Sequence, residues 1–333
     1  PPPPGISYRK VVGENERNWI DGSDVYIDSR HTLSANRNLH SLTIYQGGNV
    51  DIRAPYRLTI GAGGINVYAS VSAAYISGGG VLTSSQKFLD VWLRVQGENF
   101  EVFHIGSVIA DNGVNSVGLR IRGPVNNGYR AVVLDGDKSN TFTGPVLVSG
   151  RSTRITLNKT KGAIAISGDI FIDSGARIAL WGSKQIGRNS TVRLRDSSFQ
   201  FTRASFIKEE SFHKLVVEGK SLLHFDWSGS PQGKRFLYLD DLSIANGAEL
   251  VVQGWREGTH FFLVRKTSSN LEDALKRIAF KEYLPGRTQL EDYNKDYWAI
   301  SGTPEPATYG ATFGVVGIGL VVWRKKKPHR HCR

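Results

Sequence analysis

The chain has 333 residues, of which 40% are hydrophobic and 22% are charged, a composition that excludes a mostly disordered protein. Its length suits one large domain or two smaller ones and buries a substantial core without metal or disulfide cross-links. The net charge is +12. Residues 324–333 contain six basic residues and no acid, so half of the excess lies in this short tail. The remaining body is only mildly basic, so we expect no nucleic-acid partner, and the single Cys excludes an internal disulfide.

Short apolar stretches, separated by Gly, Asn, Asp and Ser, follow one another from residue 20 to residue 265. Each stretch alternates apolar residues with other residues, and this period of two predicts a strand with one buried face. The stretches recur about every 6–12 residues, which leaves no room for crossover helices and argues against an α/β fold. The predicted strands include Leu42–Ile44, Val50–Ile52, Leu58–Ile60, Ile65–Val67, Leu119–Ile121, Val146–Val148, Ile155–Leu157, Ile164–Ile166, Ile170–Ile172, Ile178–Leu180, Val192–Leu194, Leu242–Ile244 and Leu250–Val252.

Three all-β architectures fit these strands: a sandwich, a barrel and a parallel β-helix. The strands are very short and more numerous than a single sandwich needs. Most connections resemble corners rather than two-residue hairpins. Stacked coils that turn at Gly or Asn therefore fit best, and we expect an irregular parallel β-helix over residues 20–265. Residues 1–19 are expected to form a flexible N-terminal segment.

A cap with a short helix and a last strand is expected over residues 266–303. Ser269 and Glu272 have the spacing of a capping box. Apolar residues then follow at the helical spacing from Leu271 to Ala279. We therefore predict one helix near residues 270–281 that covers the open end of the stacked coils.

The C-terminus combines three features in a fixed order. Pro304, Glu305 and Pro306 precede Ala307–Trp323, a run of 17 residues without a charge. As a helix this run spans roughly 25 Å, close to the thickness of a hydrocarbon core. A basic cluster follows immediately, and the positive-inside bias places it in the cytoplasm. We expect a transmembrane anchor helix at Ala307–Trp323, followed by a cytoplasmic tail that begins with Arg324, Lys325, Lys326 and Lys327.

These three features resemble the PEP-CTERM sorting signal of exported Gram-negative bacterial proteins. The opening Pro304–Gly310, with the sequence PEPATYG, matches its usual start closely. The resemblance implies a transient anchor in the inner membrane and cleavage near Pro304-Glu305-Pro306 by a membrane-embedded exosortase. It also implies delivery to the cell surface or extracellular matrix, with an exopolysaccharide as a further partner. The tail beyond Lys327 is longer than the family pattern requires.

A second resemblance lies in the middle of the chain. Leu134–Gly150, with the core Asn140-Thr141-Phe142-Thr143-Gly144, is similar to the autotransporter-associated β-strand repeat. That repeat builds right-handed parallel β-helices in passenger proteins. Pro145 replaces a usual second Gly, and Thr153-Arg154-Ile155 replaces the usual Gly-Thr-Leu.

Candidate residues for catalysis are few. Acids lie close together in the sequence at Asp135/Asp137, Asp169/Asp173 and Asp240/Asp241. Polysaccharide lyases and glycosidases need two such acids in a cleft, but Asp beside Gly is more typical of turns. The eight His residues form no HExxH motif. We therefore assign no catalytic, cofactor-binding or metal-binding residue.

Aromatic and basic residues leave a binding function open. Trp92, Trp181, Trp227 and Trp255 lie in or beside predicted strands, where they either pack in the core or stack on sugar rings. The outward positions of Arg120, Arg122, Arg193 and Arg195 form a solvated basic face suited to weak contact with acidic polysaccharide. The sequence thus favours a non-catalytic surface or matrix protein, with a carbohydrate-binding adhesin or a polysaccharide-active enzyme as alternatives.

Overall fold

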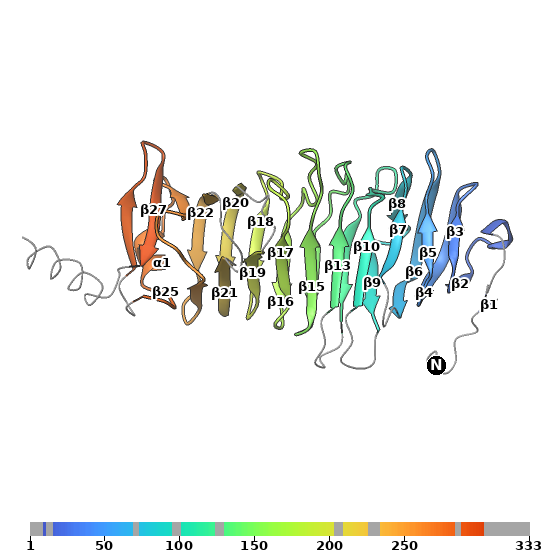
Figure 1. Cartoon of the computed structure of the whole chain (residues 1–333), viewed down its shortest axis with the longest axis horizontal. Helices are drawn as coiled ribbons and strands as arrows, with labels where there is room; N and C mark the ends of the chain where they lie inside the picture. The colour runs from blue at the N-terminus through green and yellow to red at the C-terminus, as the bar shows by residue number, and fades with distance from the viewer. Residues whose placement is uncertain are drawn as a thin grey trace, which may run out of the picture.

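The protein is described by a computed structural model that covers residues 9–10, 16–68, 73–94, 101–123, 130–202, 209–225, 234–283 and 288–302. Its strands lie across the long axis of an elongated stack, with the first coils at one end and the last hairpin at the other (Figure 1). The all-β class and the parallel solenoid predicted from the sequence are both confirmed.

Two sheets contain the strands of the described part. The first sheet has 16 strands: β1 (Arg9–Lys10), β2 (Asp24–Ile27), β4 (Arg37–Tyr45), β6 (Arg57–Tyr68), β8 (Val81–Ser84), β9 (Phe88–Leu93), β11 (Val108–Ile109), β12 (Gly118–Arg122), β14 (Val146–Ser149), β16 (Ile170–Asp173), β18 (Thr191–Leu194), β20 (Glu209–Val217), β22 (Arg235–Ile244), β24 (His260–Arg265), β26 (Thr288–Asp292) and β27 (Tyr297–Gly302). The second sheet has 11 strands: β3 (Arg30–Thr32), β5 (Asn49–Asp51), β7 (Ala74–Ser77), β10 (Glu101–Ile105), β13 (Arg130–Leu134), β15 (Thr153–Leu157), β17 (Arg177–Leu180), β19 (Ser198–Phe201), β21 (Lys220–Phe225), β23 (Glu249–Gln253) and β25 (Ile278–Phe280).

The chain alternates between the two sheets as it winds. Strand β14 belongs to the first sheet, β15 to the second, and β16 returns to the first beside β14 in parallel register. Because each coil contributes a strand to each sheet, neighbours in a sheet come from successive coils. This arrangement explains the short strands and the scarcity of hairpins in the sequence.

Apolar side chains of successive coils stack in rows inside the solenoid. Val146 pairs with Ile170, and Ile170 pairs with Val192. All three are fully buried. The residues that alternate with the buried ones along each strand, such as Phe171 after Ile170, are partly exposed on the outer face. The period of two therefore separates core from surface, as predicted.

The segment Ile164–Ile166, predicted as a strand, is a corner instead. No strand forms there, and Ile166 makes only an isolated bridge to Ile186 of the next coil. Both residues are buried nevertheless. Ile164 is only partly buried, whereas Ala165 and Ile166 are fully buried, so the alternation seen in the sequence does not mark the inward side of this corner.

The solenoid ends in an antiparallel hairpin. Strand β24 pairs with β27, and β27 pairs with β26, both in antiparallel register. The other strand pairs in the described part are parallel. Ile300 on β27 is fully buried, so the hairpin adds to the core while it reverses the strand direction.

The predicted helix is shorter than expected. Helix α1 covers only Leu271–Leu275, and Asn270 rather than Ser269 is the N-cap, without a side-chain capping bond. The predicted capping box is therefore wrong. The later part of the apolar stripe belongs to β25, because Ile278 and Phe280 pair with Leu250 and Val252 of β23.

The N-terminal end is also packed. Glu16–Asn18 form one 3-10 turn. Trp19 lies in the hydrophobic core with only 4% of its surface exposed. These residues cover the first coil at the opposite end from the hairpin.

Candidate functional site

The predicted sorting signal lies outside the described residues. Pro304, Glu305, Pro306, the run Ala307–Trp323 and the basic cluster Arg324–Lys327 all follow residue 302, where the description ends. Within the described ranges, no helix has the length and apolar character needed to cross a membrane.

The structure separates the acids Asp135 and Asp137. Asp135 bonds through Oδ2 to His104 Nδ1 at 2.7 Å, on the preceding coil. Asp137 accepts a bond from Lys161 Nζ at 2.9 Å, on the following coil. The Lys161 bond lowers the pKa of Asp137 below its ordinary value. The two carboxylates therefore join different coils instead of facing one substrate.

Asp240 and Asp241 have the same kind of role. Asp240 accepts bonds from Arg188 at 2.6 Å and from Arg265 at 2.7 Å. Asp241 lies 2.8 Å from Lys214 Nζ. Burial raises the pKa of Asp241, but its bonds to Lys214 and Ser268 outweigh burial and hold the pKa below its ordinary value. Each carboxylate thus has cationic partners of its own.

Asp169 and Asp173 also have separate environments. Asp169 Oδ1 accepts the backbone N–H of Thr191 at 2.8 Å, a contact with the next coil. Asp173 ends strand β16 and is partly buried. In the described part, no hydrogen bond joins the two acids. The bond of Asp169 is therefore a contact between coils, typical of Asp near a turn, and not part of an acid pair.

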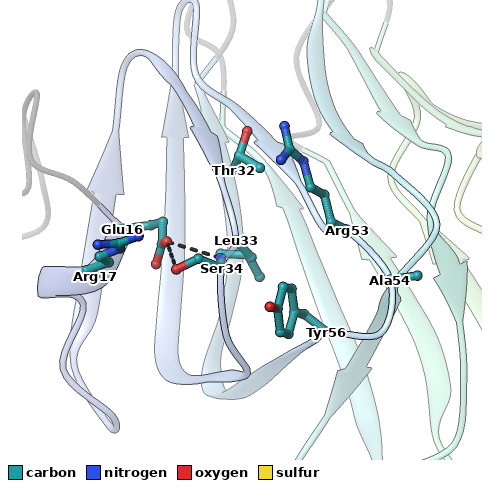
Figure 2. A pocket seen from close by; sticks show the side chains of 8 residues that line it. All are labelled: Glu16, Arg17, Thr32, Leu33, Ser34, Arg53, Ala54 and Tyr56. Atoms are coloured by element: carbon teal, nitrogen blue, oxygen red, sulfur yellow. Dashed lines mark hydrogen bonds between the residues drawn. The ribbon is translucent and has the colours of Figure 1, made fainter.

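A hollow of about 490 Å³ lies at the N-terminal end (Figure 2). Glu16 is the acidic residue that lines this hollow. The Glu16 carboxylate accepts hydrogen bonds from the Ser34 hydroxyl at 2.5 Å and the Ser34 backbone N–H at 3.1 Å. Arg37 donates a further bond at 2.6 Å. Burial raises the pKa of Glu16, while these bonds lower it and prevail. Glu16 thus joins the first turn to the next segments, and this hollow lacks the second acid that glycoside hydrolysis uses. The residues that line it are Glu16, Arg17, Thr32, Leu33, Ser34, Arg53, Ala54 and Tyr56.

The predicted tryptophans have different surroundings. Trp255 is a core residue with 8% exposure. Arg154 lies over the ring of Trp181 at 5.8 Å. Trp227 falls outside the described ranges. Trp92 lies on the outer face of the first sheet, with Arg94 and Arg122 against its ring at 4.7 and 4.8 Å from the centroid.

The basic face predicted from alternating arginines is mostly neutralised. Arg120 donates two bonds to Asp90, at 2.5 and 2.7 Å. Arg193 and Arg195 both bond to Glu218. Arg122 differs because its guanidinium group lies over the Trp92 ring.

A cluster of aromatic side chains near the hairpin was not predicted. Phe236 stacks on Phe261 at 4.7 Å, and Tyr238 meets Tyr297 edge to face at 5.4 Å. Burial, followed by nearby tyrosines and Glu209, raises the pKa of Tyr238 to about 12. These rings pack together on the outer face of the first sheet, where the hairpin joins it. Tyr293, between β26 and β27, completes the cluster with its ring 5.7 Å from that of Phe261. No sequence pattern predicts the cluster, because its members come from three separate strands and a turn.

The described ranges contain no group of three or more His, Cys, Asp or Glu residues able to hold a metal ion. The candidate binding feature on the surface of the described residues is the indole of Trp92 with the guanidinium groups of Arg94 and Arg122. No protein-family model, curated protein or solved structure matches the chain.

Proposed function

We propose that the protein is a non-catalytic component of a bacterial cell surface or extracellular matrix. Its elongated solenoid serves as a rigid body, wound in the right-handed sense that the autotransporter-associated repeat implies. An exosortase releases it from a transient inner-membrane anchor at Ala307–Trp323. The three-part C-terminus supports this route, and the parallel solenoid fits the passenger-like body.

The contacts of the acids support a non-catalytic role more than any other observation. Asp135, Asp137, Asp240 and Asp241 each bond to a basic side chain from another segment of the solenoid. A general acid in a glycosidase needs a raised pKa and access to the leaving group. The pKa values of Asp137 and Asp241 are instead lowered by their partners.

The His104–Asp135 pair is the observation that most favours an enzyme, because a carboxylate beside an imidazole can support proton transfer. The test is release of reducing ends and of unsaturated products from a panel of acidic and neutral glycans. We expect no turnover by the purified chain. Turnover that disappears in both Asp135→Asn and His104→Gln, but persists in the surface variant Asp137→Asn, would establish the enzyme instead.

The sorting route has a separate test. We expect surface-released protein to lack residues 324–333, as determined by intact mass. Replacement of Pro304, Glu305 and Pro306 by Ala should leave the whole tail attached and the protein in the membrane fraction. Release of protein that still carries Arg333 would contradict processing by an exosortase.

A further inference from the structure

The register of the solenoid builds an arginine–indole site from Trp92, Arg94 and Arg122. Trp92 lies on β9 between Asn66 of β6 and Arg122 of β12, in one row across three neighbouring strands. Arg94 follows Trp92 on the same side of the chain and donates from Nε to Asn66 Oδ1 at 3.2 Å. Arg94 therefore lies toward the preceding coil and Arg122 toward the following coil. Both guanidinium groups lie over the indole ring, at 4.7 Å (Arg94) and 4.8 Å (Arg122) from its centroid.

The charges of this site lack the compensation found elsewhere on the same sheet. In the described part, neither Arg94 nor Arg122 forms an ion pair with a carboxylate, whereas Arg120, Arg193 and Arg195 do. Contact with the indole stabilises each cation by only about 0.5–1 kcal/mol at an exposed position. Two like charges held on one ring repel each other. An anion that bonds to both would relieve that repulsion.

We propose that the arginine–indole site binds an acidic polysaccharide, whose carboxylate groups accept paired N–H bonds from Arg94 and Arg122. Planar guanidinium groups suit carboxylates because they donate two parallel bonds. This ligand goes beyond the proposed surface function, which does not depend on it.

The surroundings of the site favour a glycan over other polyanions. Two arginines already lie over the Trp92 ring, so a nucleobase would have to displace a guanidinium group to stack there, as single-strand binding requires. The neighbours in the same row are Asn66 and, beyond Arg122, Ser149. Amide and hydroxyl groups of this kind hydrogen-bond to sugar hydroxyls, while a membrane surface site would need exposed apolar side chains beside the cations.

The experiment measures binding of the purified chain to polygalacturonate by titration calorimetry, with dextran as the neutral glycan and duplex DNA as another polyanion. The test variant is Arg94→Gln/Arg122→Gln. The control is Arg195→Gln/Lys220→Gln, which removes the same charge from residues that have carboxylate partners. Thermal melting of each variant establishes that it is folded.

We expect the test variant to bind polygalacturonate at least about tenfold more weakly than the control, a change equal to about 1.4 kcal/mol of binding free energy. Binding should weaken as salt rises and should be undetectable with dextran. Equal weakening in both variants would overturn the site, because net charge alone would then explain binding. DNA binding with the same affinity and the same loss would overturn the ligand class. Binding that depends on Tyr293 at the hairpin cluster, but not on Arg94 and Arg122, would also overturn the proposal. Depolymerisation of polygalacturonate in the same samples would instead count against the non-catalytic function.

Discussion

Buried polar side chains stabilise the corners that follow the strands of the second sheet in successive coils. Asn140 accepts the backbone N–H of Ile109 at 3.0 Å and donates to the carbonyl of Ala165 at 2.9 Å, so it joins three coils. Gln185 bonds in the same way to the backbone N–H and carbonyl of Lys159, at 2.7 and 3.0 Å. These side chains satisfy backbone groups that a corner leaves without strand partners.

Removal of the Asn140 side chain should be costly for this reason. Asn140→Ala leaves a buried N–H and a buried carbonyl without partners, and we expect the free energy of unfolding to fall by about 2–4 kcal/mol. Denaturant unfolding measures the change. Asn115→Ala, at an exposed position, should stay within about 0.5 kcal/mol of the parent. Equal effects of the two substitutions would contradict the corner role of Asn140.

Glu210 gives the corner a dependence on pH. Its buried carboxylate accepts backbone N–H bonds from Gln185 at 2.8 Å and Ser211 at 3.0 Å. Burial outweighs these bonds and raises the pKa of Glu210 to about 8. The folded chain therefore keeps a proton that the unfolded chain loses near its ordinary pKa of 4.5. The stabilising effect is complete below that ordinary pKa and is lost as pH rises through the folded pKa.

We expect the free energy of unfolding to fall by up to about 4 kcal/mol between about pH 5 and pH 8 because of Glu210. Glu210→Gln has no proton to lose, so its curve should lack this contribution. Denaturant unfolding across the pH range provides the measurement. Glu209→Gln, a neighbour that pairs with Lys184, should retain the decline. The same slope in the parent and Glu210→Gln would show that Glu210 is ionised throughout.

At the scale of the elements, strand pairing depends on tight corners between them. Gly78 has a φ of +100°, and an added Cβ would lie 2.3 Å from the Ile52 carbonyl oxygen. The adjacent Gly79 has room for a Cβ, with its nearest contacts at 3.7 Å. Coils that stack this closely tolerate a side chain at one position and not at the next.

These neighbouring glycines provide a matched pair of substitutions. We expect Gly78→Ala to lower the free energy of unfolding by at least about 2 kcal/mol, because it combines a disfavoured φ with a backbone clash. Gly79→Ala should change it by less than about 0.5 kcal/mol. Chemical denaturation of the two variants compares them directly. A larger loss for Gly79→Ala would contradict this description of the corner.

The alternation of apolar residues made the strands predictable, but it did not define their ends or every corner. Val146–Val148 was correctly predicted, since a strand buried on one face has a period of two. Ile164–Ile166 has the same alternation yet forms a corner, in which the adjacent Ala165 and Ile166 are buried and Ile164 is only partly buried. The stripe from Leu271 to Ala279 looked helical because residues of a short helix and of the following strand happen to share one spacing.

The arginine–indole site could be predicted only in part. Arg122 was predicted to face outward and Trp92 was left as either a core or a sugar-stacking residue, but their contact depends on the register of β9 and β12. The coils vary in length, so the sequence shows no fixed repeat from which that register follows. Arg94 was missed for the same reason, because its position depends on Asn66 of the preceding coil. For acids such as Asp135 and Asp137, the neighbouring Gly predicted a position in a turn. The sequence did not predict that their partners, His104 and Lys161, lie on neighbouring coils.

Over the whole molecule, each coil contacts chiefly the coils beside it. Interior strands such as β15 have a neighbour on both sides, whereas β3 and β25 each end the second sheet. The stability of such a stack is close to a sum of coil terms and nearest-neighbour terms. Opening should therefore begin at the ends.

We expect amide hydrogen exchange to be slowest in β13, β15 and β17 and at least about tenfold faster in β3 and β25, because exchange follows the free energy of local opening. Exchange measured by mass spectrometry on proteolytic fragments resolves these segments. Uniform protection from one end to the other would show that the solenoid opens as a single cooperative unit.

Strands that lie across the long axis also determine how the protein responds to force. A pull between its two ends acts along the direction of the inter-strand hydrogen bonds, so these bonds break in succession, as in a zipper, rather than in parallel. Successive coils carry their equivalent residues 24 apart at Val146 and Ile170, and each released coil adds up to roughly 80 Å of extended chain. A body of this kind yields under tension by lengthening one coil at a time, and the coils that remain keep their paired strands and their core.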